Sequence, residues 1–170
     1  RSSDLMDEDD CMIDIAKFYL GFCVDESCGK CAPCRIGGVQ MLKLLEKVSE
    51  GLGTQKDLEQ LQMISQAMQK ASLCGLGQTA PNPVLSTLTY YRPEYEAHVK
   101  QKKCPACKCA KLVRFLIMSE KCVKCGMCFK ACPVNAISGN RESGYLIDQT
   151  KCIRCGQCFE VCKPRAINRS

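Results

Sequence analysis

Residues 121–137 read KCVKCGMCFKACPVNAI, and residues 151–167 repeat the pattern as KCIRCGQCFEVCKPRAI. Both segments place three cysteines at C-x-x-C-x-x-C and a fourth cysteine shortly after them. They also share a glycine after the second cysteine, a phenylalanine after the third and a closing Ala-Ile. A duplication of this kind predicts two similar half-units related by a pseudo-two-fold axis.

The cysteine spacing suits a cubane cluster of iron and sulfide. A C-x-x-C-x-x-C loop can wrap three iron corners, and we expect the fourth cysteine to start a short helix that points toward the opposite half. Gly126 and Gly156 let the backbone bend close to sulfur. The apolar runs at residues 112–118 and 145–147 predict two strands.

Over residues 112–169 the repeat resembles the bacterial two-[4Fe–4S] ferredoxins. The resemblance implies that each fourth cysteine ligates the cluster of the other repeat. One ligand set is then Cys122, Cys125, Cys128 and Cys162, and the other is Cys132, Cys152, Cys155 and Cys158. Pro164 comes one place later than the family pattern has it, which we expect to alter hydrogen bonding to sulfur but not ligation. The alternative is a zinc module with coincidental spacing.

Composition and charge narrow the class of protein. The chain has 17 cysteines among 170 residues, mostly in short chelating series, which favours metal centres over disulfides. We find no signal peptide and no apolar run of the roughly 18 residues that a membrane span needs, so we expect a cytoplasmic protein away from the membrane. Residues 101–170 carry 14 basic against 4 acidic residues. Cluster thiolates offset part of that charge and no aromatic platform accompanies it, which disfavours nucleic acid and leaves an acidic protein partner.

A third cysteine loop lies upstream, in ESCGKCAPCRIG at residues 26–37. Its candidate fourth ligand is distant, in SLCGLG at residues 72–77. Two predicted helices separate them, the first with an apolar face over residues 41–48 and the second opened by a capping box from Thr54 to Asp57. Apolar spacing predicts further helices over residues 12–22 and 84–91. A hairpin of the two middle helices would return the second segment to the first.

This upstream region, over residues 9–98, resembles the cluster-binding end of the NADH-oxidising flavoprotein subunit of complex I. The resemblance implies a [4Fe–4S] cluster that accepts electrons from FMN, with Lys30 and Arg35 favouring its reduced state. Its implied ligands are Cys28, Cys31, Cys34 and Cys74. A zinc or disulfide cluster in a helical bundle is the alternative.

The fusion of both regions resembles the beta subunits of multimeric, NAD-linked [FeFe]-hydrogenases, including electron-bifurcating ones. It implies a hydrogenase catalytic subunit, a thioredoxin-like [2Fe–2S] subunit and external ferredoxin as partners. NAD-linked formate dehydrogenases have similar subunits and are the nearest competitor. The resemblance implies FMN and NAD(H) sites upstream of Arg1. Residues 75–77 are no dinucleotide loop, because they follow no predicted strand and lack the third glycine. We therefore expect a piece of a longer protein.

Five cysteines remain outside these three sets. Three of them lie in KCPACKC at residues 103–109, shortly after the chain's single histidine. One histidine and three cysteines fit a structural zinc site, although the C-x-C step is tight and another cysteine could replace one of the three. A fourth iron–sulfur cluster or free thiols are the alternatives. The expected zinc ligands are His98, Cys104, Cys107 and Cys109. Cys11 and Cys23 are expected to be small buried hydrophobes.

The sequence thus predicts an α+β protein with three [4Fe–4S] clusters and a zinc ion. A helical iron–sulfur bundle spans residues 1–98, a linker with the zinc site spans 99–111, and a ferredoxin-like domain spans 112–170. The expected role is an electron relay, part of an enzyme but without a catalytic centre of its own. A metal-stabilised structural module and a free-standing ferredoxin with a helical extension are the rival functions.

Overall fold

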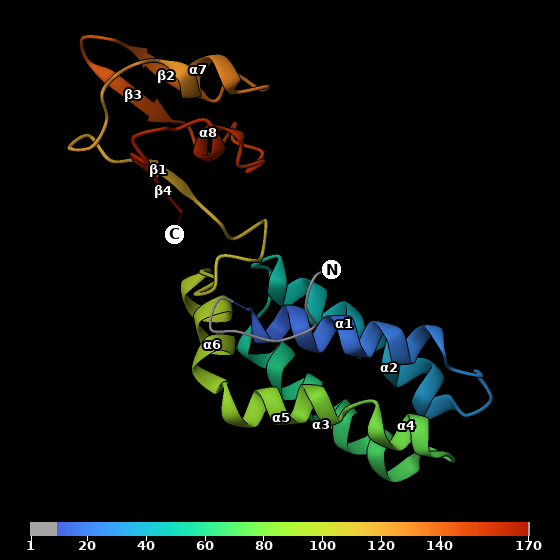
Figure 1. Ribbon diagram of the computed structural model, residues 1–170. Coiled ribbons are helices and arrows are strands. Elements are labelled where there is room, and N and C mark those ends of the chain that lie inside the picture. Colours follow the sequence, from blue (N-terminus) through green and yellow to red (C-terminus); the bar gives the residue numbers. More distant parts are fainter. Residues whose placement is uncertain (1–9, 170) are drawn as a thin grey trace. The chain divides into compact units, whose positions relative to one another are not determined.

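The computed structural model describes residues 10–169, and this part of the chain forms two compact units (Figure 1). The first unit runs to Leu112 and the second begins at Val113. Residues 99–111, the expected linker, therefore lie inside the first unit. Each unit is described by itself below.

The first unit is a bundle of helices. Its elements are α1 (Met12–Asp25), α2 (Ala32–Ser49), α3 (Gln55–Ala71), α4 (Gly75–Thr79), α5 (Asn82–Tyr90), α6 (Arg92–Glu96) and a π-helical turn, η1 (Ala97–Gln101). The four longest helices, α1, α2, α3 and α5, confirm the helices that the apolar periodicity of the sequence predicts. The short helices α4 and α6 and the π-helical turn were not predicted, because segments of about five residues carry too little periodic signal.

The core of the bundle lies where α1, α2, α3 and α5 meet. Met41 and Leu45 from α2 and Leu61 from α3 are fully buried there. The helix α1 buries Ile13, Ala16 and Leu20, whereas its aromatic side chains Phe18, Tyr19 and Phe22 are 59%, 45% and 60% exposed. The aromatic residues that helped to predict this helix thus lie outside the core.

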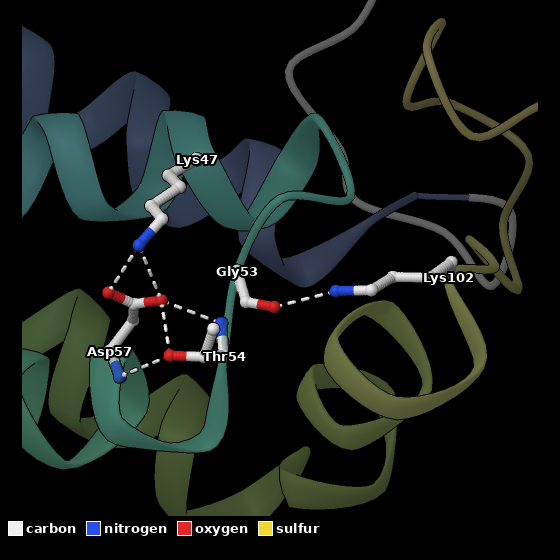
Figure 2. A network of polar contacts seen from close by, with 5 residues as sticks. All are labelled: Lys47, Gly53, Thr54, Asp57 and Lys102. Carbon is white, nitrogen blue, oxygen red and sulfur yellow. Dashed lines mark hydrogen bonds and ion pairs between the residues drawn. The ribbon is translucent and has the colours of Figure 1, made fainter.

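The turn between α2 and α3 is fixed by polar contacts (Figure 2). The predicted capping box is present: the Thr54 hydroxyl accepts from the Asp57 amide, and the Asp57 carboxylate accepts from the Thr54 amide at 2.6 Å. The Lys47 ammonium donates to both Asp57 oxygens, at 2.8 and 2.9 Å. Since Asp57 is buried, this ion pair and cap hold the two helices in one hairpin.

The segment after the π-helical turn is attached to the same α2–α3 turn. The Lys102 ammonium donates to the carbonyl oxygen of Gly53 at 2.6 Å (Figure 2). Lys111 forms an ion pair with Glu50. Gly51 has φ of +79°, and a Cβ there would lie 2.5 Å from the Leu112 side chain. These contacts make residues 102–112 part of the bundle.

The second unit is a small α+β module. Its elements are β1 (Phe115–Ile117), α7 (Met127–Ala131), β2 (Ile137–Asn140), β3 (Gly144–Ile147), α8 (Gln157–Glu160) and β4 (Ile167–Arg169). Two antiparallel pairs form, with Phe115 opposite Arg169 in β1–β4 and Ile137 opposite Ile147 in β2–β3. Each half contributes one short helix, so the predicted α+β class and duplication are confirmed.

Candidate metal centres

The first candidate centres are two cavities in the second unit, each lined by four cysteines. One cavity is lined by Cys122, Cys125, Cys128 and Cys162. The other is lined by Cys132, Cys152, Cys155 and Cys158. Each cavity thus takes three cysteines from one repeat and the fourth from the other. A donor set of four thiols in an otherwise apolar pocket fits a [4Fe–4S] cluster.

The loops around the two cavities share an unusual backbone. Lys124 and Arg154 have φ of +55° and +59°, and Gly126 and Gly156 follow at +77° and +79°. Alternating left-handed residues turn successive amide groups toward one side of the loop, which forms a concave site for an anion. At Gly126 a Cβ would also lie 2.7 Å from the Tyr145 hydroxyl. Glycine is therefore favoured there for two reasons.

The short helices lead the chain from one cavity to the other. Cys128 lies in α7, and Cys132 follows that helix as its C-cap. The expectation that the fourth cysteine starts a helix is thus wrong: the helix begins after the left-handed glycine, and the fourth cysteine ends it. In the second repeat α8 likewise contains Cys158 and ends before Cys162.

Each fourth cysteine accepts one backbone hydrogen bond at sulfur. The Ala136 amide lies 3.2 Å from Cys132 Sγ, and the Ala166 amide lies 3.2 Å from Cys162 Sγ. The displaced Pro164 therefore leaves this bond unchanged, contrary to the sequence expectation. Such N–H donors favour the more negative form of a ligated cluster and so raise its reduction potential.

Three of the four cysteines expected to hold the cluster of the bundle lie at the N-termini of two helices. Cys31 is the N-cap of α2 with Cys34 in its first turn, and Cys74 is the N-cap of α4. The amides of Leu73 and Cys34 lower the pKa of Cys31, which favours its thiolate. A Cβ at Gly77 would lie 3.2 Å from the Cys34 side chain. The α2–α3 hairpin therefore brings the Cys74 segment beside Cys31 and Cys34, as the sequence analysis expected.

Two polar residues shape the loop before α2. The Arg35 guanidinium donates to the carbonyl oxygen of Gly29 at 2.8 Å, and Gly29 has φ of +70°. The Ser27 hydroxyl accepts from the Gly29 amide and lies 3.3 Å from Cys34 Sγ. Cys28 is exposed on this loop. The loop is thus folded around Cys34, while Cys28 faces solvent.

A different kind of site lies at the other end of the bundle. Four buried residues place their ligand atoms within 4.8 Å of one another: Cys11, His98, Cys104 and Cys109. His98 Nε2 lies 3.6 Å from Cys11 Sγ and 3.5 Å from Cys109 Sγ, and those two sulfurs are 3.7 Å apart. For Zn–S of about 2.3 Å and Zn–N of about 2.05 Å, a tetrahedron has edges of about 3.8 and 3.6 Å. The group has the size of one tetrahedral ion.

His98 is held in the orientation that a metal ligand needs. Its Nδ1 donates to the Glu94 carbonyl oxygen at 2.8 Å, which leaves Nε2 to face the three thiols. The residue lies in the π-helical turn, and turns of this type are frequent at functional sites. The wider turn places the imidazole over the start of α1, where Cys11 is the N-cap.

The three thiols share their charge unevenly. Hydrogen bonds from Cys109 and Cys11 hold the pKa of Cys104 far below its usual value, which favours its thiolate. Donation to Cys104 in turn raises the pKa of Cys11 well above normal and that of Cys109 to about 12. Burial lowers the pKa of His98, but its contact with Cys104 outweighs burial and raises it overall. One anion shared by several donors is the arrangement that a cation would replace.

Cys11 was expected only as a small buried hydrophobe, and the structure places its buried thiol in this group. Cys107, the expected fourth ligand, does not belong to the group: it has φ of +50° and its Sγ lies 3.9 Å from the Pro105 carbonyl oxygen. The C-x-C step points neighbouring side chains apart, so Cys109 reaches the site and Cys107 does not. Cys23 is half-buried in α1, where burial raises its pKa. The tight C-x-C step was the one signal that a ligand from elsewhere was needed.

A duplicated module with two four-cysteine cavities, joined to a helical bundle with a third cysteine loop, defines the chain as an iron–sulfur electron-transfer protein. Residues 14–98 match the family described as NADH-ubiquinone oxidoreductase-F iron-sulfur binding region, and residues 114–163 match the 4Fe-4S dicluster domain. The chain belongs to the NADH-ubiquinone oxidoreductase-F iron-sulfur binding family.

Individual relatives agree with this assignment. The NADP-reducing hydrogenase subunit HndC of Solidesulfovibrio fructosivorans is 50% identical over 81% of this chain and 28% of its own length. The alpha subunit of the NAD-reducing hydrogenase HoxS of Cupriavidus necator is 38% identical over 50% of this chain and 14% of its own. The solved NAD+-reducing [NiFe]-hydrogenase in the H2-reduced state matches 56% of this chain, 16% of its own, at TM-score 0.54 and 37% identity.

The chain therefore spans less than a third of each of these relatives. No helix among residues 10–169 combines the length and the apolar character that crossing a bilayer requires.

Proposed function

We propose that this chain is an electron relay with three [4Fe–4S] clusters, within a subunit of an NAD-linked hydrogenase. The observation that carries the proposal is the pair of four-cysteine cavities with crossed ligand sets. When bound, a [4Fe–4S] cluster gains or loses one electron without breaking a bond. The residues of this chain then hold the clusters, exclude water from them and set their potentials through N–H donors to sulfur.

The proposed ligands follow the cysteine sets described above. The module would hold two clusters through its two cavities. The third would be held by Cys31 and Cys34 at the N-terminus of α2, by Cys74 at the N-terminus of α4 and by Cys28 on the loop before α2. Helix N-termini stabilise the negative charge that a thiolate-bound cluster carries. FMN and NAD(H) belong to the part of the longer protein that precedes this chain.

The similarity to HndC, a hydrogenase subunit, favours a hydrogenase over a formate dehydrogenase as the enzyme that contains this chain. Its identity of 50% extends over 81% of this chain, which is more than residues 14–98 alone. We place the protein in the cytoplasm, with a hydrogenase catalytic subunit, a thioredoxin-like [2Fe–2S] subunit and external ferredoxin as partners. Electron bifurcation would use both NAD(H) and ferredoxin as two-electron and one-electron partners.

The group of four ligands supports a second role for the bundle, as a structural element that zinc stabilises. Three buried thiols and one imidazole at tetrahedral spacing fit zinc, and the Nδ1 bond to Glu94 is the support that a zinc-bound histidine needs. A cubane would need its sulfurs further apart. We propose Cys11, His98, Cys104 and Cys109 as the ligands, in place of the set that includes Cys107.

Anaerobic reconstitution of the 170-residue chain tests the relay against a purely structural role. The relay predicts about twelve iron and twelve sulfide per chain, together with EPR signals that appear on reduction and disappear on oxidation. Zinc alone, with no reducible signal, would overturn the relay and leave the structural role. One zinc in addition to the iron supports both proposals.

A further inference from the structure

The surface of the second unit is positively charged around its first cavity. Residues 113–169 contain ten basic and four acidic residues. The first loop that lines the first cavity reads KCVKC at residues 121–125. Its residues Lys121, Lys124 and Cys125 are all exposed. Between the two lysines, Val123 is 67% exposed. An apolar centre with a cationic rim is the composition of a protein interface, and here it adjoins a cavity cysteine that faces solvent.

The Lys124 ammonium of this loop is held in place by a neutral group. The Lys124 ammonium donates to the backbone carbonyl oxygen of Glu142, a neutral acceptor. The contact therefore orients the ammonium group without neutralising it. In the second repeat the corresponding Arg154 is half-buried, so the second loop exposes fewer cations.

The two cavities also differ in where the chain enters the module. Phe115, at the start of β1, lines the second cavity and contacts Phe159 with ring centroids 6.2 Å apart. Ile117, at the end of β1, lines the first cavity. Strand β1 therefore begins beside the second cavity and ends beside the first.

We propose that residues 121–125, with Lys121 and Lys124 around Val123, form the docking surface for a small acidic protein that carries single electrons. This inference rests on the proposed relay and identifies the site at which the relay exchanges electrons with an external carrier. Opposite charge steers such a partner to the loop, and Val123 gives a short-range contact once it arrives. One electron passes between the carrier and the cluster of the first cavity, so one is oxidised as the other is reduced and no proton moves. A second copy of this chain is disfavoured, because it presents the same positive surface.

The test compares Lys121→Glu with Lys151→Glu in the reconstituted chain. Both lysines are exposed, both directly precede the first cysteine of their loop, and both variants change the net charge equally. The probe is an acidic plant-type [2Fe–2S] ferredoxin, whose absorption differs from that of the clusters. Binding of the oxidised pair is measured by calorimetry, and electron transfer from the reduced probe is measured by stopped-flow. Absorption and EPR spectra establish that every variant retains its clusters.

At low salt, Lys121→Glu should weaken binding and slow transfer by about tenfold, and Lys151→Glu by less than about threefold. High salt should remove most of the difference. Val123→Ser should weaken binding at every salt concentration, because its contribution is not electrostatic. Equal effects of the two lysine variants, or no binding by the unsubstituted chain, would overturn the docking surface. Binding that shows the Lys121 dependence without electron transfer would instead overturn the relay.

Discussion

At the scale of single residues, the chemistry of this chain depends on which cysteine reaches which site. Cys11 and Cys109 are 98 positions apart in the chain and yet have sulfurs 3.7 Å apart, whereas Cys107 lies outside the group. Residue type and spacing therefore identify a metal-binding region but not all of its ligands. Only the packing of α1 on the rest of the bundle determines the fourth one.

Replacing the two cysteines separately distinguishes the ligand from its neighbour. Cys11→Ser should lower zinc affinity by more than about 100-fold, since loss of a direct ligand costs more than loss of an outer partner. Cys107→Ser should leave affinity within about threefold of the original. Competition with a chromophoric chelator measures both constants. Loss of zinc from the Cys107 variant alone would contradict the ligand set proposed here.

The two loop glycines provide a second matched pair. Both have positive φ, but a Cβ at Gly126 would lie 2.7 Å from the Tyr145 hydroxyl, whereas at Gly156 the nearest atom is 3.8 Å away. Gly156→Ala should cost about 1 kcal/mol from backbone strain alone. Gly126→Ala should cost more, because the tyrosine must also move. Thermal unfolding of the reconstituted chain, followed by cluster absorption, measures the difference, and equal losses would rule out the steric contribution.

At the scale of elements, the α2–α3 hairpin determines whether Cys74 reaches the other cysteines of its set. Its turn depends on a buried carboxylate that caps α3 and pairs with α2. Burial raises the pKa of Asp57, but hydrogen bonds from Lys47 and Thr54 outweigh burial and lower it overall. A carboxyl whose folded pKa is lowered stabilises the protein above its unfolded value of about 4, and that stability is lost as pH falls below it.

Asp57→Asn should therefore destabilise the bundle by about 1–2 kcal/mol at neutral pH. The difference from the unsubstituted chain should stay constant between pH 6 and 8, because Asp57 is ionised throughout that range. Lys47→Met removes only the ion pair, whose lysine is 43% exposed, and should cost less than about 1 kcal/mol. Urea unfolding monitored by circular dichroism measures both. A larger cost for the lysine variant would mean that the ion pair, and not the cap, dominates.

The same elements show what can be predicted from the sequence. The cysteine repeat and the Thr54–Asp57 capping box are local patterns, and both appear as expected. The long helices follow from periodicity, but the face that α1 buries does not: its aliphatic residues Ala16 and Leu20 are inside and Phe18 is outside. The strand β4 pairs with the distant β1, and His98 of the π-helical turn contacts the distant Cys11, whereas β2 pairs with the adjacent β3. Their short segments carry no signal of their own.

At the scale of the whole molecule, the crossed ligand sets make each cluster of the module depend on both repeats. Cys132 belongs to the first repeat by sequence, yet it lines the cavity of the second. Cys132→Ala should therefore reduce the EPR signal of the cluster held by Cys152, Cys155 and Cys158, while the other cluster retains its four cysteines. Loss confined to the cluster of its own repeat would contradict the crossed assignment. Cys107→Ala is the matched control, because Cys107 lies outside every proposed set.

The two units can also be tested as separate pieces. The structure divides after Leu112, and the contacts of Lys102 and Lys111 attach the preceding segment to the bundle. Residues 1–112 expressed alone should retain one zinc and about four iron, and residues 113–170 about eight iron. Metal analysis after anaerobic reconstitution measures both. Zinc loss from the first piece would show that its site needs the second unit.

The contact between Cys11 and Cys109 has a consequence for anything attached to the bundle. The first described residues of the bundle, Asp10 and Cys11, contact Lys108 and Cys109 near its last residue, Leu112. Two modules joined to the bundle by short connections at this point would have a high effective concentration for each other. Encounters between them would then be first-order, with a rate that does not change when the protein is diluted.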